Sequence, residues 1–297
     1  MSTKQRIPEW FKQSKSKLVA TRNLENKLGE AIPNSICQEA RCPNRSECYS
    51  KGVLTFMILG ITCTRNCAFC SVTHGVPKPP NTNELLSILN SIEKLDLKFV
   101  VLTSPNRDDL ADGGAGHYAY IVKGIKEKFP HVKVEVLIPD FQGDESAIDI
   151  VIDAKPDVIN HNMETVPSLY SIARKGSIFN RSLAVLAYVK KKAPHILSKS
   201  GLMVGLGETT DELADTFQKI STANVDILTI GQYLKPDKNS LDVDKYYHPD
   251  EFKELENTAL SMGFKFVFSG PLIRSSYFAE HVFDELNQGD IRELASA

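Results

Sequence analysis

Every cysteine of this 297-residue chain lies within residues 37–70, and the six cysteines form two groups of three. The second group, Cys63, Cys67 and Cys70, has the spacing C-x3-C-x2-C, so its three thiols can converge from one short loop. A single Zn²⁺ ion would need a fourth ligand, and His74 is near enough in the sequence to complete a Cys₃His set. A cluster of four irons and four sulfides, held by three cysteines, would instead leave one iron open to a small molecule.

The first group, Cys37, Cys42 and Cys48, has the different spacing C-x4-C-x5-C and precedes the other. A net charge of -2 gives no general attraction to nucleic acid. No run approaches the ~20 apolar residues that cross a bilayer, and the first residues lack the apolar centre of a secretory signal. We therefore expect a cytoplasmic protein without membrane or nucleic-acid partners, in which cysteines serve as metal ligands rather than in disulfides.

Short apolar runs alternate with amphipathic stretches after residue 54. Runs with strand length and composition occupy residues 55–59, 99–103, 132–138, 157–160, 201–205, 226–230 and 264–268. Apolar residues return every three or four positions in 83–95 and in the stretches that begin after Gly116, Asp211 and Pro249, which predicts helices.

Strands that alternate with helices predict a parallel α/β fold. We expect a partial (β/α)6 TIM-type barrel, with an open doubly wound sheet as the alternative. The predicted domains are an N-terminal extension (residues 1–50), the barrel (51–262) and a C-terminal extension (263–297). In either fold the active-site groups belong just after the carboxyl ends of the strands, which is where the loop of Cys63 lies.

The loop around Cys63, with Phe69 before its last cysteine, resembles the cluster loop of radical S-adenosylmethionine enzymes. That resemblance implies a 4Fe-4S cluster on Cys63, Cys67 and Cys70, whose open iron binds the amino and carboxylate groups of S-adenosylmethionine.

Further motifs resemble the lipoyl synthase family within that superfamily. Residues 42–48, CPNRSEC, are similar to the family's C-P-N-x-x-E-C segment, which holds an auxiliary cluster. Similar segments run nearly the whole chain: RIPEWF (6–11), TFMILG (55–60), TSPNRDDLADGG (103–114), NHNMETV (160–166), VGLGE (204–208) and SGPLIRSSY (269–277).

The resemblance implies a sulfurtransferase that inserts two sulfur atoms, at C6 and C8 of an octanoyl chain on a lysine of a lipoyl domain. It implies a second, auxiliary 4Fe-4S cluster on Cys37, Cys42 and Cys48, completed by a serine oxygen that we place on Ser276, with Ser275 as the alternative. This cluster would be consumed as the sulfur source, and two S-adenosylmethionine molecules would be used per lipoyl group.

Contacts to S-adenosylmethionine also follow from the resemblance. They are expected from residues that end strands or flank the cluster loop: Phe69, Thr103, Ser104, Asn160, Asn162, Glu164, Gly205 and Glu208. From the residues alone, strand-to-helix turns and helix caps explain several of these positions equally well.

The partners implied are octanoylated lipoyl domains of E2 subunits or of the glycine cleavage H protein, an electron donor such as ferredoxin or flavodoxin, and an iron-sulfur carrier. Other sulfur-inserting radical enzymes fit less well, because biotin synthase has its auxiliary ligands downstream and a methylthiotransferase needs a nucleic-acid-binding module. A non-catalytic iron-sulfur carrier would require four thiolates per cluster, which six cysteines cannot supply.

Overall fold

The computed structural model describes residues 6–11, 35, 39 and 54–276. Its main feature is a seven-stranded sheet, in which each strand is parallel to its neighbours and the spatial order follows the chain. The strands are β1 (Leu54–Met57), β4 (Phe99–Thr103), β5 (Lys133–Leu137), β6 (Val158–Asn160), β7 (Leu197–Val204), β8 (Ile227–Gln232) and β9 (Phe266–Gly270). The short strands β2 (Thr62–Cys63) and β3 (Thr73–His74) form a separate parallel pair.

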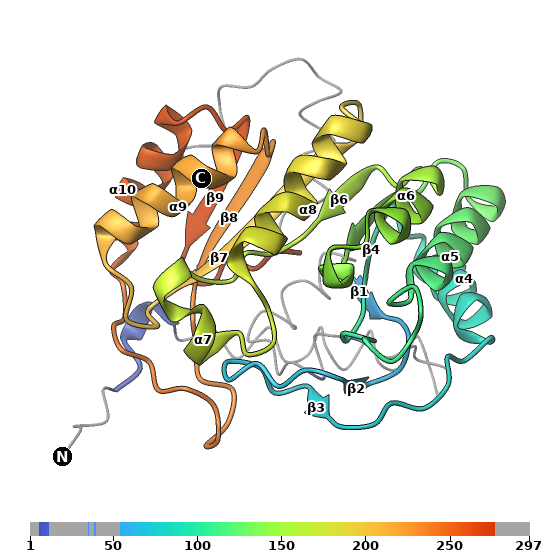
Figure 1. Cartoon of the computed structure of the whole chain (residues 1–297), viewed down its shortest axis with the longest axis horizontal. Helices are drawn as coiled ribbons and strands as arrows, with labels where there is room; N and C mark the ends of the chain where they lie inside the picture. Colours follow the sequence, from blue (N-terminus) through green and yellow to red (C-terminus); the bar gives the residue numbers. More distant parts are fainter. Residues whose placement is uncertain (1–5, 12–34, 36–38, 40–53, 277–297) are drawn as a thin grey trace.

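Helices follow the strands around the outside of the sheet (Figure 1). They are α4 (Glu84–Leu95), α5 (Ala115–Lys128), α6 (Glu145–Asp153), α7 (Tyr170–Ala173), α8 (Phe179–Lys192), α9 (Thr210–Thr222) and α10 (Pro249–Ser261), with short 3₁₀ turns η1 (Glu9–Phe11), η3 (Phe141–Gly143) and η4 (Pro167–Leu169). This singly wound arrangement confirms the predicted partial TIM-type barrel and excludes the doubly wound alternative, which would place helices on both faces.

The two faces of the sheet differ in chemistry. Toward the helices, Val100, Leu102, Val134 and Val136 are fully buried in one apolar cluster with helical residues such as Ile121. The face turned away from that cluster carries polar groups in the middle of the sheet. There the Lys199 ammonium lies 3.0 Å from the Glu135 carboxylate, which also accepts a 3.0 Å hydrogen bond from the Asn160 amide.

Two carboxylates, the buried Asp226 and the partly buried Asp157, close the amino ends of the strands. Asp226, just before β8, binds Lys190 and Lys265 and accepts a hydrogen bond from the Ser198 amide. Asp157, just before β6, takes the same position beside Lys126, Lys133 and the Val134 amide. Each carboxylate therefore joins a strand start to the neighbouring strand and to an outer helix.

Most sequence-predicted strands and helices match the observed elements within a few residues, while α6, α7, α8 and the short strands β2 and β3 were not predicted. The sheet continues past residue 262, where the C-terminal extension was predicted to begin, because β9 pairs with β8. At the opposite edge, Ser35 forms an antiparallel bridge with Phe56 of β1. None of the helices in the described ranges has the length and apolar character that crossing a bilayer requires.

Candidate active site at the carboxyl ends of the strands

The cysteine loop begins after β1 with a turn that hydrogen bonds to Glu84 and Arg107 stabilise. Leu59 and Gly60 have left-handed φ angles of 65° and 86°. The Glu84 carboxylate, at the start of α4, accepts hydrogen bonds from both amides at 2.9 and 3.3 Å, and Arg107 donates to the Leu59 carbonyl at 2.9 Å. Because a left-handed leucine is unfavourable by itself, these bonds define where the loop starts.

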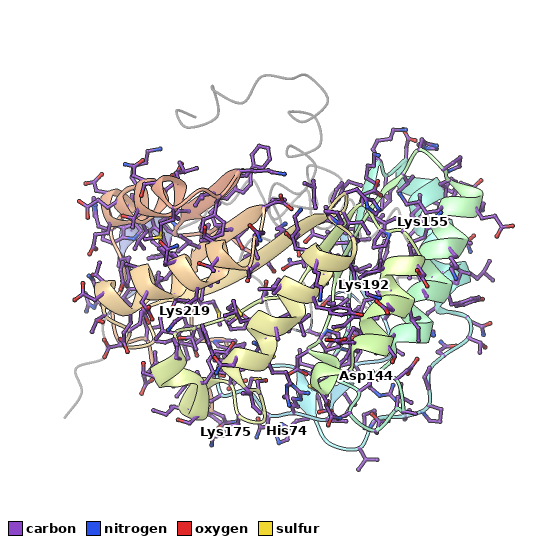
Figure 2. All side chains as sticks on the ribbon, turned by 45° about the horizontal axis from the view of Figure 1, so that its top comes forward. His74, Asp144, Lys155, Lys175, Lys192 and Lys219 are labelled. Atoms are coloured by element: carbon purple, nitrogen blue, oxygen red, sulfur yellow. The ribbon has the colours of Figure 1, made fainter. Side chains whose placement is uncertain are left out.

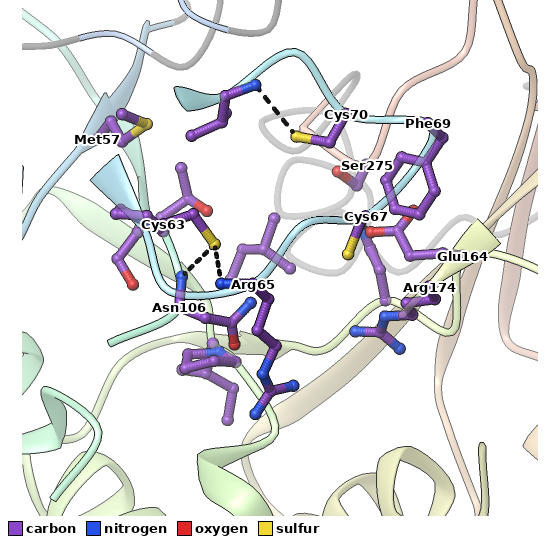
Figure 3. A pocket seen from close by; sticks show the side chains of 18 of the residues that line it. Met57, Cys63, Arg65, Cys67, Phe69, Cys70, Asn106, Glu164, Arg174 and Ser275 are labelled. Atoms are coloured by element: carbon purple, nitrogen blue, oxygen red, sulfur yellow. Dashed lines mark hydrogen bonds between the residues drawn. The ribbon is translucent and has the colours of Figure 1, made fainter. Parts of the chain in front are cut away.

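Cys63, Cys67 and Cys70 are free thiols that line one cavity of about 260 Å³ (Figure 3). The Cys63 sulfur accepts hydrogen bonds from the backbone amides of Arg65 and Asn106 at 3.4 and 3.3 Å. The Cys70 sulfur accepts one from the Val72 amide at 3.4 Å. Amide donors directed at sulfur favour the thiolate form and are a common feature around iron-sulfur clusters.

Burial makes Cys67 and Cys70 poor thiolates without a positive partner. Desolvation raises the pKa of Cys67 to about 12 and that of Cys70 to about 11. A bound metal reverses such a shift, because it takes the place of the proton on sulfur. The three thiols therefore fit a metal group better than they fit separate thiolate chemistry.

A single zinc ion is less well matched to the described residues. His74, the fourth ligand of the zinc alternative, is exposed on β3 and is absent from the residues that line the cavity. Within the described ranges, no three His, Cys, Asp or Glu side chains converge closely enough for one ion. A 4Fe-4S cluster does not need that convergence, since each cysteine binds a different iron.

Arg65, between Cys63 and Cys67, extends from the loop to two carboxylates. Its guanidinium lies 2.7 Å from Asp108, which follows β4, and 2.7 Å from Asp140, which follows β5. Although burial acts to raise the pKa of the Asp140 carboxyl, the hydrogen bond from Arg65 holds it well below its usual range. Both groups are therefore charged, and they attach the cysteine loop to the ends of two strands.

A second buried arginine, Arg174, lies beside Cys67 and Glu164 (Figure 3). Its guanidinium donates to the Tyr170 hydroxyl at 2.9 Å and to the Ser182 hydroxyl at 3.0 Å. Burial raises the pKa of Glu164, and the positive charge of Arg174 opposes that shift. Arg174 thus supplies positive charge next to the thiols, where negative charge from a cluster or a substrate carboxylate would gather.

Five of the predicted S-adenosylmethionine contacts line the same cavity: Phe69, Thr103, Ser104, Asn162 and Glu164. The Oδ1 atom of Asn162 is buried and accepts no hydrogen bond from the described part of the chain. A ligand that donates a hydrogen bond there would satisfy it, so the cavity wall fits a polar molecule bound between the cysteine loop and the strand ends.

The other three predicted contacts, Asn160, Gly205 and Glu208, are not among the residues that line this cavity. Asn160 is within β6 and donates to Glu135 in the middle of the sheet. Glu208 accepts hydrogen bonds from the Gly205 and Leu206 amides at 2.5 and 2.9 Å, and so holds the turn after β7. For these three residues a contact with S-adenosylmethionine stays a prediction.

Ser275 lines both the main cavity and an adjoining one of about 90 Å³ that extends toward β7 and β8. Ser276, the predicted ligand, is described but is not among the residues that line either cavity. Cys37, Cys42 and Cys48 lie outside the described residues. The choice between the two serines therefore stays open.

Sequence reasoning missed the two buried arginines and Asp140. Arg65 carried a usable signal, since it stands between two predicted metal ligands and a charged side chain there must find a partner. Arg174 and Asp140 carried none, because each is one polar residue in a long connection. Only the fold brings them to the cysteines.

Comparison with known proteins defines the class. The sequence profile of the Radical SAM superfamily matches residues 57–220. The solved structure of methylornithine synthase superimposes with a TM-score of 0.56 at 13% identity, over 86% of this chain and 79% of that one. A structure of Streptococcus suis SuiB bound to S-adenosylmethionine gives 0.57 at 12% identity, over 86% and 61%. These structures share the fold, and the chain belongs to the radical S-adenosylmethionine superfamily.

Closer relatives specify the family. The lipoyl synthase of Caldicellulosiruptor saccharolyticus is 48% identical over 280 residues, 94% of this chain and 98% of the relative. That of Hahella chejuensis is 46% identical over 276 residues, 93% of this chain and 83% of the relative. Within the superfamily, the chain belongs to the lipoyl synthase family. It is an enzyme, a radical S-adenosylmethionine sulfurtransferase, and its class implies a 4Fe-4S cluster and S-adenosylmethionine as cofactors.

Proposed function

We propose that this enzyme inserts two sulfur atoms, at C6 and C8 of an octanoyl chain attached to a lysine of a lipoyl domain. The observation that carries the proposal is a shared cavity. Ser275, from the RSSY segment (residues 274–277), lines the same space as Cys63, Cys67 and Cys70. A segment implicated in sulfur donation and a loop suited to radical generation therefore face one substrate.

Cys63, Cys67 and Cys70 would hold the catalytic cluster. With S-adenosylmethionine bound, that cluster would supply a 5′-deoxyadenosyl radical able to remove hydrogen from an unactivated carbon. Asn162 would accept a hydrogen bond from the bound ligand through its unsatisfied Oδ1 atom. Arg174 would offset the negative charge of the thiolates and of the ligand carboxylate.

The remaining groups of the cavity would exclude water and orient the ligand. Phe69 adds apolar surface beside the cysteines, while Ser104 donates a 3.0 Å hydrogen bond to the oxygen of the buried Tyr118 hydroxyl. Tyr118 is fixed in turn, since it donates to the Leu137 carbonyl at 2.7 Å. A wall tied across β4 and β5 in this way leaves a reactive radical little room to meet side chains or solvent.

Sulfur would come from an auxiliary 4Fe-4S cluster, a consumed substrate, bound by Cys37, Cys42, Cys48 and a serine of the RSSY segment, Ser276 in our assignment. A serine oxygen suits this role, because it binds iron less firmly than a thiolate and can leave when sulfur is removed. Two described contacts support this arrangement. Ser71, next to Cys70, donates to the Glu39 carbonyl at 2.8 Å, and Ser35 bridges to β1.

The partners we propose are octanoylated lipoyl domains of E2 subunits or of the glycine cleavage H protein, with ferredoxin or flavodoxin as reductant. An iron-sulfur carrier would rebuild the auxiliary cluster, and two S-adenosylmethionine molecules would be used per lipoyl group.

The test is anaerobic reconstitution with iron and sulfide, followed by addition of an octanoyl-lysyl lipoyl domain, S-adenosylmethionine and a low-potential reductant. We expect mass spectrometry to show a dithiolane on the domain, together with 5′-deoxyadenosine. Formation of 5′-deoxyadenosine from wild-type protein that holds both clusters, without any change to the octanoyl chain, would refute the substrate assignment.

Variants separate the two cysteine groups. Cys42→Ala should still form 5′-deoxyadenosine but no dithiolane, whereas Cys63→Ala should form neither. The pair Ser275→Ala and Ser276→Ala then identifies the serine ligand, because only the ligand's loss should stop sulfur insertion while radical formation continues.

A further inference from the structure

Arg65 is the centre of a charged network beneath the cysteine loop. Its guanidinium binds Asp108 and Asp140 and also donates to the Ser177 hydroxyl at 3.2 Å. Asp140 binds a second arginine, Arg181 at the start of α8, at 2.8 Å. The Asp140 side chain is 0% exposed and that of Arg65 is 6% exposed, whereas Asp108 is 28% exposed. Asp140 is therefore the buried member that joins the two arginines.

The same network reaches the connection that carries Arg174. The Ala68 amide, inside the cysteine loop, donates to the Ala173 carbonyl at 2.9 Å. At the other end of this connection, Arg181 donates to the Gly176 carbonyl at 3.2 Å. Residues 173–181 thus contact the cysteine loop directly at one end and through Asp140 at the other.

We propose that Asp140 is a positioning residue, which holds the cysteine loop and the connection carrying Arg174 in fixed relation to each other. Two guanidinium groups converge on one buried carboxylate. Arg65 belongs to the cysteine loop, and Arg181 lies in the first turn of α8, from which it donates to the Gly176 carbonyl of the connection. Neither segment is part of the sheet, so strand pairing cannot set their separation. The positioning role of Asp140 does not depend on the proposed function. Its consequence does rest on that function: holding the two segments in place would align the catalytic cluster with the charge of Arg174.

The chain offers a matched control in Asp226. This carboxylate is also buried, binds two cationic side chains and accepts a hydrogen bond from a backbone amide, but it lies at the amino ends of the strands. Asp140→Asn and Asp226→Asn each remove one charge and keep the shape of the side chain. Any effect common to both variants reflects lost stability, and any effect confined to Asp140→Asn reflects positioning.

Hydrogen exchange in the metal-free protein measures the order of the two segments without any cluster chemistry. For Asp140→Asn we expect amide exchange in residues 63–70 and in 173–178 to become about tenfold faster, because charge-assisted bonds to both segments are lost. Asp226→Asn should leave both segments unchanged. Equal exchange changes in the two variants, or no change in Asp140→Asn, would overturn the proposal.

A double-mutant cycle tests whether Arg65 and Asp140 act through each other. If they do, the effect of combining Arg65→Gln with Asp140→Asn on exchange should be smaller than the two single effects added together, because the shared ion pair is lost only once. Additive effects would mean that the two side chains act independently. Arg65→Lys should give only partial protection, since one ammonium cannot pair with Asp108 and Asp140 in the way a planar guanidinium does.

A spectroscopic measurement tests whether the charged network around Asp140 affects ligand binding at the cysteine site. In reduced, reconstituted Asp140→Asn protein, the change in the electron paramagnetic resonance signal on adding S-adenosylmethionine should need about tenfold more ligand than in wild type. If amide exchange in the loop becomes faster but the required S-adenosylmethionine concentration stays the same, Asp140 does not align the cluster with Arg174. If wild-type protein binds no cluster, the proposed function fails, whereas the exchange result still decides the role of Asp140.

Discussion

Asp140 and Asp226 are chemically alike but lie at opposite ends of the same sheet. Asp226, just before β8, binds Lys190 on α8 and Lys265, just before β9. Asp140 joins Arg65 to Arg181 and so ties the cysteine loop to the first turn of α8. At the amino ends of the strands, the ion pairs therefore stabilise the barrel. At the carboxyl ends, they position loops around a cavity.

The surroundings of the two ends agree with this division. Lys155, Lys192 and Lys219, which Figure 2 labels, lie apart from one another on the outer surface. At the carboxyl end, two buried arginines instead face one cavity that contains three thiols. Arginine suits that position because it stays charged when buried and binds carboxylates with a planar geometry.

The largest expected effect is at the carboxyl end. Cys67→Ala should abolish both 5′-deoxyadenosine and lipoyl formation. The two remaining thiolates cannot hold the catalytic cluster, because a second iron would be left without a protein ligand. Unfolding of the metal-free variant should match wild type within about 0.5 kcal/mol, as expected when a change leaves the packed framework intact. Product analysis and denaturant unfolding measure the two quantities, and a large loss of stability would show that this thiol belongs to the framework instead.

The next effect concerns the charge beside the cysteines. Arg174→Leu should lower lipoyl formation about 100-fold, because the thiolates, Glu164 and the ligand carboxylate would lose their nearest cation. Arg174→Lys should recover part of this loss, since it keeps the charge but not both hydrogen bonds to Tyr170 and Ser182. The rate of 5′-deoxyadenosine formation at varied S-adenosylmethionine concentration is the measurement. Equal rates in wild type and Arg174→Leu would remove Arg174 from the site.

Arg174 also shows where sequence reasoning stops. The cysteine spacing, the strand runs and the glycine turns are local patterns, so they predicted the barrel and the loop of Cys63. The family resemblance added part of the cavity wall. Arg174 and Asp140 are defined by neighbours that lie far along the chain, such as Cys67 and Arg65. No local periodicity or spacing records such a pair, because the separation depends on how β5, α7 and α8 pack.

The same distinction explains the assignments that the cavity does not include. The contact of Asn160 with S-adenosylmethionine was expected from the family resemblance and stays a prediction. Alternate residues of a strand face opposite sides, so the sequence alone did not show which way the Asn160 side chain faces. Its position in the middle of the sheet, beside Glu135 and Lys199, depends on register, and the sequence did not specify register.

At the amino end we expect changes in stability without changes in chemistry. Asp226→Asn should lower the free energy of unfolding of metal-free protein by about 2 kcal/mol, because two lysines lose a buried partner. Lipoyl formation per folded, reconstituted molecule should stay at the wild-type level. Denaturant unfolding and the product assay give the two values, and a loss of activity without a loss of stability would contradict the division between the ends.

The pH dependence of this effect has a definite sign. Although burial acts to raise the pKa of Asp226, hydrogen bonds from Lys190 and Lys265 hold it below its usual range. A carboxyl with a lowered pKa stabilises the fold fully above the ordinary aspartate pKa of about 3.9, and the contribution is lost as the pH falls below it. The difference between wild type and Asp226→Asn should therefore be constant from pH 7 to pH 5 and shrink below about pH 4. A difference that stays constant at lower pH would show that the charge of Asp226 is not its source.

The smallest expected effect is at the carboxyl end, where not every residue serves the site. Thr209 caps α9 through a reciprocal pair of bonds with Glu212, so Thr209→Ala should cost about 1 kcal/mol of stability.

Its neighbour Glu208 holds the turn after β7 and accepts a 3.1 Å hydrogen bond from Tyr247. If the predicted ligand contact is real, Glu208→Gln should raise the S-adenosylmethionine concentration needed for half-maximal rate, while Thr209→Ala leaves it unchanged. An equal shift in both variants would mean that the turn responds to helix stability alone and that Glu208 has no separate contact with the ligand.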